Sequence, residues 1–343
     1  MQTSILTFLI AAVVVLLLGP IIIPTLKRLK FGQTEREDGP QTHLIKSGTP
    51  TIGGIMMIAA IIIATLAGIY LPELIGLKDG ITGDKVGFLT PAILVMCAYG
   101  LVGFIDDFIK VKTKSSLGLR AYQKIIAQFA FALVYALYLK NTLGTSIYLP
   151  FFNVEWDISW LYVPFAMFVI IAVVNCVNLT DGLDGLASGV TLIYSITMCV
   201  VFLYLSKAAA VEGYKLIEGT GSLAIYAAAL GGACLGFLRF NSYPAKVFMG
   251  DTGSMALGGA ISVLALTSRA VFLLPIMGIC FVASGVSVIL QVGSYKLRNK
   301  KRIFKMAPLH HHFEKLGYCE SKIVSGYMIV TTFACLICLL AFI

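Results

Sequence analysis

The sequence predicts an all-α protein embedded in a membrane, with a single domain that covers residues 1–343 and crosses the bilayer ten times. Apolar residues make up 58% of the chain and charged residues only 13%, whereas charged residues form about a quarter of a typical soluble domain. The apolar residues gather in runs of roughly 15 to 25 residues, the length that a helix needs to cross the hydrocarbon core. This composition excludes a soluble globular protein.

The first expected span is not a secretory signal peptide. Its basic residues Lys27, Arg28 and Lys30 follow the apolar run, whereas a signal peptide carries them before it. We therefore expect an uncleaved helix with its N-terminus outside. The ten expected spans are residues 5–26, 52–70, 89–104, 122–139, 160–177, 186–205, 223–238, 255–268, 271–295 and 323–343.

The sequence around Arg269 decides between nine and ten spans. A single helix over residues 255–295 would be about 60 Å long, which is roughly twice the hydrocarbon thickness. Two spans, residues 255–268 and 271–295, match the bilayer better. The second is long, and we expect it either to tilt or to break, with Pro275 and Gly285 as the candidate weak points.

Lysine and arginine are distributed unevenly over the loops. If the N-terminus is outside, the loops after odd-numbered spans face the cytoplasm, and they hold 20 of the 26 Lys and Arg residues. This bias agrees with the positive-inside rule and predicts that both termini are extracytoplasmic. It also accounts for the net charge of +9, so no nucleic-acid partner is expected.

The polar motifs all fall in these cytoplasmic loops: HLIKSGTPTIGG, GFIDDFIKVKTK, NLTDGLDGL, FMGDTGS and PLHHHFE. Several have a purely structural alternative as an acidic helix end, a capped turn or a glycine-rich helix start. In NLTDGLDGL, however, Asp181 and Asp184 are spaced to share a helical face with Asn178, and a cap explains only one of the two carboxylates. The glycines around Asp251 leave backbone N–H groups accessible, which suits a phosphate.

The side chains in these motifs favour magnesium over zinc. Mg²⁺ typically uses one or two carboxylates together with water and substrate phosphates, so Asp251, or the pair Asp106 and Asp107, would suffice. The three consecutive histidines of PLHHHFE have no accompanying His or Cys pair at zinc spacing, so we expect them to bind phosphate or sugar. Together the motifs indicate phosphoryl transfer between a cytoplasmic nucleotide substrate and a lipid.

Five ordered motifs resemble those of a known family. HLIKSGTPTIGG, GFIDDFIKVKTKSSLGL, NLTDGLDGLASG, FMGDTGS and PLHHHFE look like the motifs of the phospho-N-acetylmuramoyl-pentapeptide transferases. These enzymes form a branch of the polyprenyl-phosphate N-acetylhexosamine-1-phosphate transferases. The resemblance runs from the first expected span to the last, without a departure inside the motifs.

The resemblance implies a ten-helix homodimer in the bacterial inner (cytoplasmic) membrane, with its active site on the cytoplasmic face. The reaction it implies transfers phospho-MurNAc-pentapeptide from UDP-MurNAc-pentapeptide to undecaprenyl phosphate, which yields lipid I and UMP in peptidoglycan synthesis. It also implies Mg²⁺ as cofactor, with Asp251 as the leading ligand. Asp106 and Asp107 would lie near the metal and the attacking lipid phosphate, and either could act as base.

Further motif residues carry over as substrate contacts. Asn178, Asp181 and Asp184 would line the nucleotide side, and Phe248 would stack on uracil. The remaining contacts implied by the resemblance are Lys46, Thr51, Lys110, Gln291, His310 and His311, of which His310 is also counted as catalytic. For Gln291 the structural alternative is an interhelical hydrogen bond.

Three other functions compete with this one. A GlcNAc-1-phosphate transferase would share the aspartates, although PLHHHFE favours the muramoyl branch. A nucleotide-sugar transporter would place ionisable residues at the bilayer midplane and carry internal repeats, whereas here the interiors of the spans are nearly free of charge and no repeat is found. A structural membrane scaffold would not need five aspartates on one side. Within the main reaction, a covalent aspartyl intermediate is the alternative to direct attack by the lipid phosphate. We favour direct attack, because a phosphate monoester has a second pKa of about 6 and is mostly dianionic at neutral pH, so its need for a base is modest.

Overall fold

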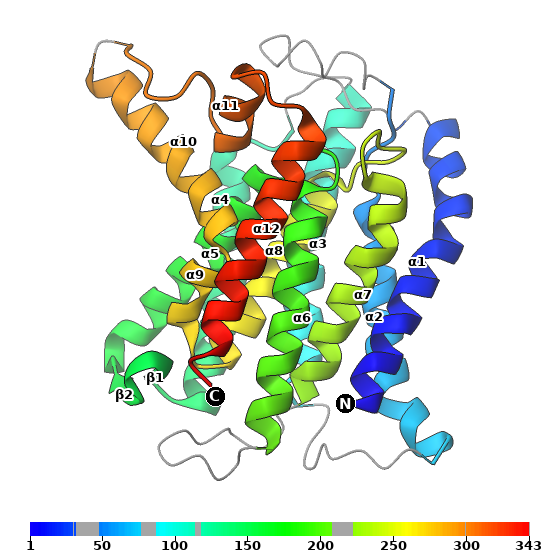
Figure 1. Cartoon of the computed structure of the whole chain (residues 1–343), viewed down its shortest axis with the longest axis vertical. Coiled ribbons are helices and arrows are strands. Elements are labelled where there is room, and N and C mark those ends of the chain that lie inside the picture. The colour runs from blue at the N-terminus through cyan, green and yellow to red at the C-terminus, as the bar shows by residue number, and fades with distance from the viewer. Residues whose placement is uncertain are drawn as a thin grey trace.

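The chain forms a bundle of long helices in the computed structural model drawn in Figure 1. The structure describes residues 1–29, 31, 48–76, 87–113, 118–207, 222–298 and 300–342. Most of the long helices run roughly along the long axis of the molecule, and the N- and C-termini lie at the same end of the bundle. The short helix α11 (Leu309–Lys315) lies at the opposite end.

Ten long helices of the described chain correspond to the ten apolar runs, although their ends often extend beyond the run. They are α1 (Gln2–Arg28), α2 (Gly54–Leu74), α3 (Leu89–Thr113), α4 (Ala121–Leu143), α5 (Tyr162–Thr180), α6 (Leu186–Lys207), α7 (Leu223–Asn241), α8 (Gly250–Thr267), α10 (Ile279–Leu297) and α12 (Glu320–Leu339).

Nine of the described helices are long and apolar enough to cross a membrane, and the prediction of an all-α polytopic membrane protein is confirmed at that level. Helix α8 is not among the nine. Its first turn carries Asp251, Thr252 and Ser254, which makes it more polar than its neighbours.

Helix α8 lies inside the bundle, and every residue from Thr252 to Thr267 is buried. Glycines let its neighbours approach closely. A Cβ at Gly103 of α3 would overlap the carbonyl group of Asp251, and a Cβ at Gly258 of α8 would lie 2.6 Å from the Cα of Val174 in α5. Small residues at such crossings are typical of membrane helices. The start of α8 is therefore held tightly against its neighbours.

The ninth expected span is interrupted at Gly278, and not at Pro275 or Gly285. A 3₁₀ turn (Val271–Leu273) and the short helix α9 (Leu274–Met277) precede the break, and α10 follows it. Pro275 lies in the first turn of α9, where its missing N–H costs no hydrogen bond. At Gly285 a Cβ would overlap the Sγ of Cys176, so this glycine serves close packing against α5 while α10 continues through it.

The connection between α4 and α5 contains a β-hairpin. Strand β1 (Ser146–Leu149) pairs antiparallel with β2 (Val154–Asp157), so that Ser146 lies opposite Asp157. The hairpin is bound to the bundle by Arg269, whose carbonyl accepts from the N–H of Tyr148 at 2.9 Å and whose Nε donates to the carbonyl of Ser146 at 3.2 Å. It lies at the same end of the bundle as the chain termini (Figure 1).

Candidate active site

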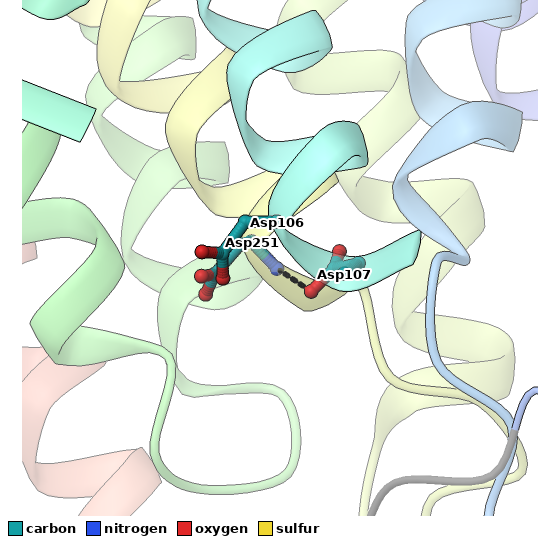
Figure 2. A group of neighbouring side chains, drawn as sticks. All are labelled: Asp106, Asp107 and Asp251. Atoms are coloured by element: carbon teal, nitrogen blue, oxygen red, sulfur yellow. Dashed lines mark hydrogen bonds between the residues drawn. The ribbon is translucent and has the colours of Figure 1, made fainter. Parts of the chain in front are cut away.

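Three carboxylates meet where the last turns of α3 pass the first turn of α8. Asp106 and Asp107 of α3 and Asp251 of α8 each present one oxygen within 4.8 Å of the others. Figure 2 shows the three side chains gathered at the ends of these two helices. The grouping follows from the close crossing at Gly103, so the acidic pair is more than the end of a membrane span.

Asp107 caps the N-terminus of α8 from a neighbouring helix. Its Oδ2 accepts from the backbone N–H of Thr252 at 2.9 Å and from the Thr252 hydroxyl at 2.7 Å, and its Oδ1 accepts from the N–H of Asp251 at 3.2 Å. Gly250 has a φ of +70°, and a Cβ there would lie 2.5 Å from Oδ2 of Asp107. Only glycine suits this position, because its backbone is left-handed and the carboxylate needs the space.

Both oxygens of Asp251 are engaged by side chains from other helices. Its Oδ2 accepts from Lys110 of α3 at 2.9 Å and from Lys124 of α4 at 2.6 Å. Its Oδ1 accepts from the side-chain amide of Asn178, at the end of α5, at 2.8 Å. The same amide donates to the hydroxyl of Ser254 at 2.8 Å, so Asn178 orients the first turn of α8.

Asp106 is only 1% exposed. It completes the charge cluster, which consists of Asp106, Asp107, Asp251, Lys110 and Lys124. Its Oδ2 lies 2.6 Å from the Nζ of Lys110 and 3.3 Å from that of Lys124. Its Oδ1 accepts from the N–H of Leu119 at 2.8 Å, next to Gly118, where a Cβ would lie 2.5 Å from the same oxygen. Three carboxylates facing two ammonium groups leave an excess of negative charge.

Lys124 is the site residue that sequence reasoning missed. It lies at the start of an apolar helix, where a lysine is typical of the cytoplasmic end of a span. No spacing within α4 connects it with Asp251. Only the positions of α3, α4 and α8 in the bundle bring its ammonium group to the carboxylates.

The loop after α5 brings Asp181 near the cluster, whereas Asp184 has a structural contact. Burial, together with the carboxylates of Asp251, Asp107 and Asp184, raises the pKa of Asp181 above its usual range. Asp184 accepts from the N–H of Ala245 at 2.9 Å, and its own N–H donates to Glu320 at 2.6 Å. Asp184 therefore connects this loop with the segment before α8 and with the start of α12.

The histidines of α11 pack against the same loop. His310 is fully buried, and its ring centroid lies 4.3 Å from that of His311. A Cβ at Gly182 would overlap Nε2 of His310 and would lie 3.1 Å from Nε2 of His311. His311 also contacts Glu314 through Nδ1 at 2.6 Å. The structure thus brings the PLHHHFE and NLTDGLDGL motifs together.

The other predicted contact residues have diverse surroundings. Thr51 is buried, and a Cβ at Gly250 would lie 2.7 Å from its Oγ1, which places it beside the cap of α8. Phe248 is half-buried, and its N–H donates to the carbonyl of Pro50 at 2.9 Å. Lys46 lies outside the described residues.

Gln291 of α10 holds the loop that precedes α11. Its Oε1 accepts from the N–H groups of Ile303 and Phe304, both at 3.0 Å, and its Nε2 donates to the carbonyl of Phe304 at 2.9 Å. These hydrogen bonds go to a loop, so they are not the interhelical hydrogen bond considered as the structural alternative for Gln291. A substrate contact by Gln291 stays a prediction.

Comparison with known proteins identifies the family. Residues 89–269 match the family model described as Glycosyl transferase family 4. A phospho-N-acetylmuramoyl-pentapeptide-transferase of Clostridioides difficile (strain 630) is 48% identical over 328 residues, which cover 95% of this chain and 93% of the relative. Proteins of the same name from Caldanaerobacter subterraneus subsp. tengcongensis and Alkaliphilus metalliredigens are 46% and 49% identical, and the matches cover 97% and 98% of this chain and 96% and 97% of the relatives. The chain therefore belongs to the phospho-N-acetylmuramoyl-pentapeptide transferase family.

Proposed function

We propose that this protein transfers phospho-MurNAc-pentapeptide from UDP-MurNAc-pentapeptide to undecaprenyl phosphate, forming lipid I and UMP in peptidoglycan synthesis. The family supports this proposal, and so does one observation: Asp106, Asp107 and Asp251 meet two lysine ammonium groups at one end of a membrane-embedded bundle. Such a site suits a reaction between two phosphates, one of which belongs to a lipid.

The donor set of this site fits a magnesium ion. Mg²⁺ takes oxygen ligands, and the cluster offers three carboxylates with an excess of negative charge. In the proposal Asp251 is the leading ligand and Asp106 the second. Both oxygens of Asp107 accept from backbone N–H groups of α8, whereas Oδ2 of Asp251 and Oδ2 of Asp106 face lysine ammonium groups that a metal ion can displace. When bound, the ion supplies positive charge that stabilises the negative charge on the phosphates.

Metal binding is tested without substrate. Mg²⁺ should raise the Tm of the wild-type protein, because a ligand that binds only the folded state stabilises it. Asp251→Ala should remain folded but lose both this shift and Mg²⁺-dependent UMP release. An undiminished shift, or full activity, in the variant would remove Asp251 from the metal site.

In the proposed reaction an oxygen of the lipid phosphate attacks the β-phosphorus of the UDP sugar. The bond from the β-phosphorus to the bridging oxygen breaks, and UMP leaves with that oxygen. Lys110 and Lys124 bind phosphate oxygens, since each ammonium can exchange a carboxylate partner for a phosphate. Asp106 or Asp107 accepts the proton of any monoanionic acceptor. A trapped phospho-enzyme would favour an aspartyl intermediate over direct attack.

The surrounding motif residues contact the nucleotide sugar in this proposal. Phe248 stacks on the uracil, since an aromatic face binds the face of a base. His310 and His311, which pack against Gly182, hold the pyrophosphate or the sugar, and His310 is also a candidate for a catalytic role. The further proposed contacts are Lys46, Thr51, Asn178, Asp181, Asp184 and Gln291.

The proposal extends to the membrane. The chain crosses the bacterial inner membrane ten times as one domain, with both termini outside and the site facing the cytoplasm, and acts as a homodimer. Nine crossings would separate the termini, so their common end in Figure 1 supports counting α8 as a span. The excess of Lys and Arg supports the cytoplasmic assignment. Light scattering of the purified protein tests the dimer.

The alternative reaction is a transfer of GlcNAc-1-phosphate, and the less favoured alternative is nucleotide-sugar transport. The test mixes the purified protein with UDP-MurNAc-pentapeptide, undecaprenyl phosphate and Mg²⁺, and measures UMP. We expect release with that pair. Turnover with UDP-GlcNAc alone would overturn the main choice, and uptake of the nucleotide sugar into vesicles without turnover would indicate a transporter.

A further inference from the structure

A pair of side-chain amides joins α4 and α5 inside the bundle. The Nδ2 of Asn175 donates to the Oε1 of Gln128 at 2.8 Å, and the Nε2 of Gln128 lies 3.5 Å from the Oδ1 of Asn175. Gln128 is 1% exposed. Two amides that bond to each other avoid the cost of an unpaired polar group in an apolar environment, and the bond fixes the register of their helices.

The amide pair lies one helical turn from the charge cluster. Gln128 is four residues after Lys124 on α4, and Asn175 is three residues before Asn178 on α5, so each amide shares a helix face with a partner of Asp251. Lys124 donates to Oδ2 of Asp251 and Asn178 to Oδ1. The two helices joined by the amide pair thus present the donors for the two oxygens of one carboxylate.

Tyr99 extends this layer to α3. Its hydroxyl donates to the backbone carbonyl of Gln128 at 2.9 Å, and the side chain is fully buried. Asp106 follows Tyr99 by seven residues, two turns along the same face of α3. The helices that carry Asp106, Lys124 and Asn178 are therefore bonded to one another at the level of Gln128.

We propose that Gln128 and Asn175 are positioning residues that hold Lys124 and Asn178 against the two oxygens of Asp251. Without the pair, α4 and α5 can shift relative to each other, and the carboxylate loses its fixed orientation. Displacements of about 1 Å at a catalytic group cost up to about 100-fold in rate. We expect a loss of about tenfold in kcat from the weaker constraint on one carboxylate.

The experiment compares Gln128→Leu, Asn175→Leu and the double variant with the wild type. Each should remain folded with kcat for UMP release lowered about tenfold, and the double variant should lose no more than the worse single variant, because both remove the same bond. The exchanged pair Gln128→Asn with Asn175→Gln keeps the combined reach of the two side chains. It should recover most of the kcat that Gln128→Asn alone loses, a rescue that a merely structural loss would not give.

Tyr135→Phe is the matched control, because it also removes a buried interhelical hydrogen bond of α4, the 3.0 Å contact with the hydroxyl of Thr267, far from the charge cluster. It should keep kcat within about twofold of the wild type.

The inference rests on the proposed function, so the wild type is assayed first, and its failure to turn over would refute the function itself. With an active wild type, unchanged kcat in Gln128→Leu, an equal loss in Tyr135→Phe or no rescue by the exchanged pair would overturn the positioning role. If the leucine variants do not fold, Gln128→Asn and the exchanged pair decide it.

Discussion

Lys124 donates a hydrogen bond to Oδ2 of Asp251 at 2.6 Å across a separation of 127 residues. The same ammonium lies 3.3 Å from Oδ2 of Asp106, so one lysine joins carboxylates from two helices. It therefore holds the two side chains in place as well as neutralising their charge. A residue with this double contact should be as important to the site as the acidic residues themselves.

Replacement of Lys124 by methionine should lower kcat for UMP release by about 100-fold, the usual effect of removing one electrostatic contact from a catalytic centre. Methionine keeps most of the apolar stem, so folding should be preserved. The matched control is Lys140→Met, an exposed lysine near the other end of the same helix, which should retain full activity. Equal activity in both variants would show that Lys124 is only a topology signal.

Asp107 should matter for stability as well as for chemistry. Asp107→Ala removes the acceptor of three hydrogen bonds from the first turn of α8, and the loss of a helix cap typically costs about 1–2 kcal/mol. Asp107→Asn keeps one acceptor oxygen and should lose less. Thermal unfolding in detergent measures the difference, and an unchanged Tm in the alanine variant would argue against the capping role.

Much of the fold could be predicted from the sequence, because each apolar run is long enough to be a helix by itself. The acidic motifs could also be assigned to one end of the bundle, since alternating loops face the same side. The break at Gly278 was misplaced because proline and glycine permit a break without requiring one. Pro275 is tolerated in a first turn, and Gly285 is needed for contact with Cys176.

The parts that sequence reasoning missed depend on contacts between elements. The sequence of residues 140–159 alone does not predict the hairpin, because the contacts that attach it to the bundle come from Arg269, which is distant in the sequence. The part played by Lys124 depends likewise on how α4 packs beside α3 and α8. The resemblance implies substrate contacts for Asp184 and Gln291, and the structure adds loop contacts that each side chain makes.

Gly182→Ala should reduce activity by disturbing α11. The added methyl group would overlap Nε2 of His310, so either the histidine or the loop must move. We expect at least a tenfold loss of kcat, since a displacement of about 1 Å at a catalytic group lowers the rate substantially. Gly326→Ala is the control, because a Cβ there meets nothing within 4 Å and alanine favours a helix. A similar loss in both variants would point to a general effect on the bundle.

Asp181 should make stability depend on pH. Its pKa is raised in the folded protein, so the folded state binds the proton more tightly than the unfolded chain does. Stability should therefore fall as the pH rises above the ordinary pKa of Asp, which is about 4, and should stop falling above the raised pKa of the folded state. Asp181→Asn removes this dependence, so the Tm of the variant relative to wild type should increase from pH 5 to pH 8 in EDTA. A difference that does not change with pH would contradict the assignment.

Cys319 provides a test of sidedness with a native residue. It is exposed at the start of α12, and the N–H of Lys322 and the hydroxyl of Ser321 lower the pKa of its thiol, which favours the reactive thiolate. An impermeant maleimide should label it in inside-out vesicles and not in intact cells. Cys319→Ser should abolish that labelling, and labelling of intact cells would reverse the proposed orientation.

The burial of α8 has a consequence for biogenesis. In the proposed ten-span topology α8 begins with Gly, Asp and Thr, so it gains less free energy from insertion into lipid than its neighbours do. We therefore expect its insertion to depend on contacts with α3 and α5, which precede it in the chain. Asp251 reaches Asp106 and Asp107 only when α8 packs against α3, so we expect insertion of α8 and assembly of the carboxylate cluster to occur together.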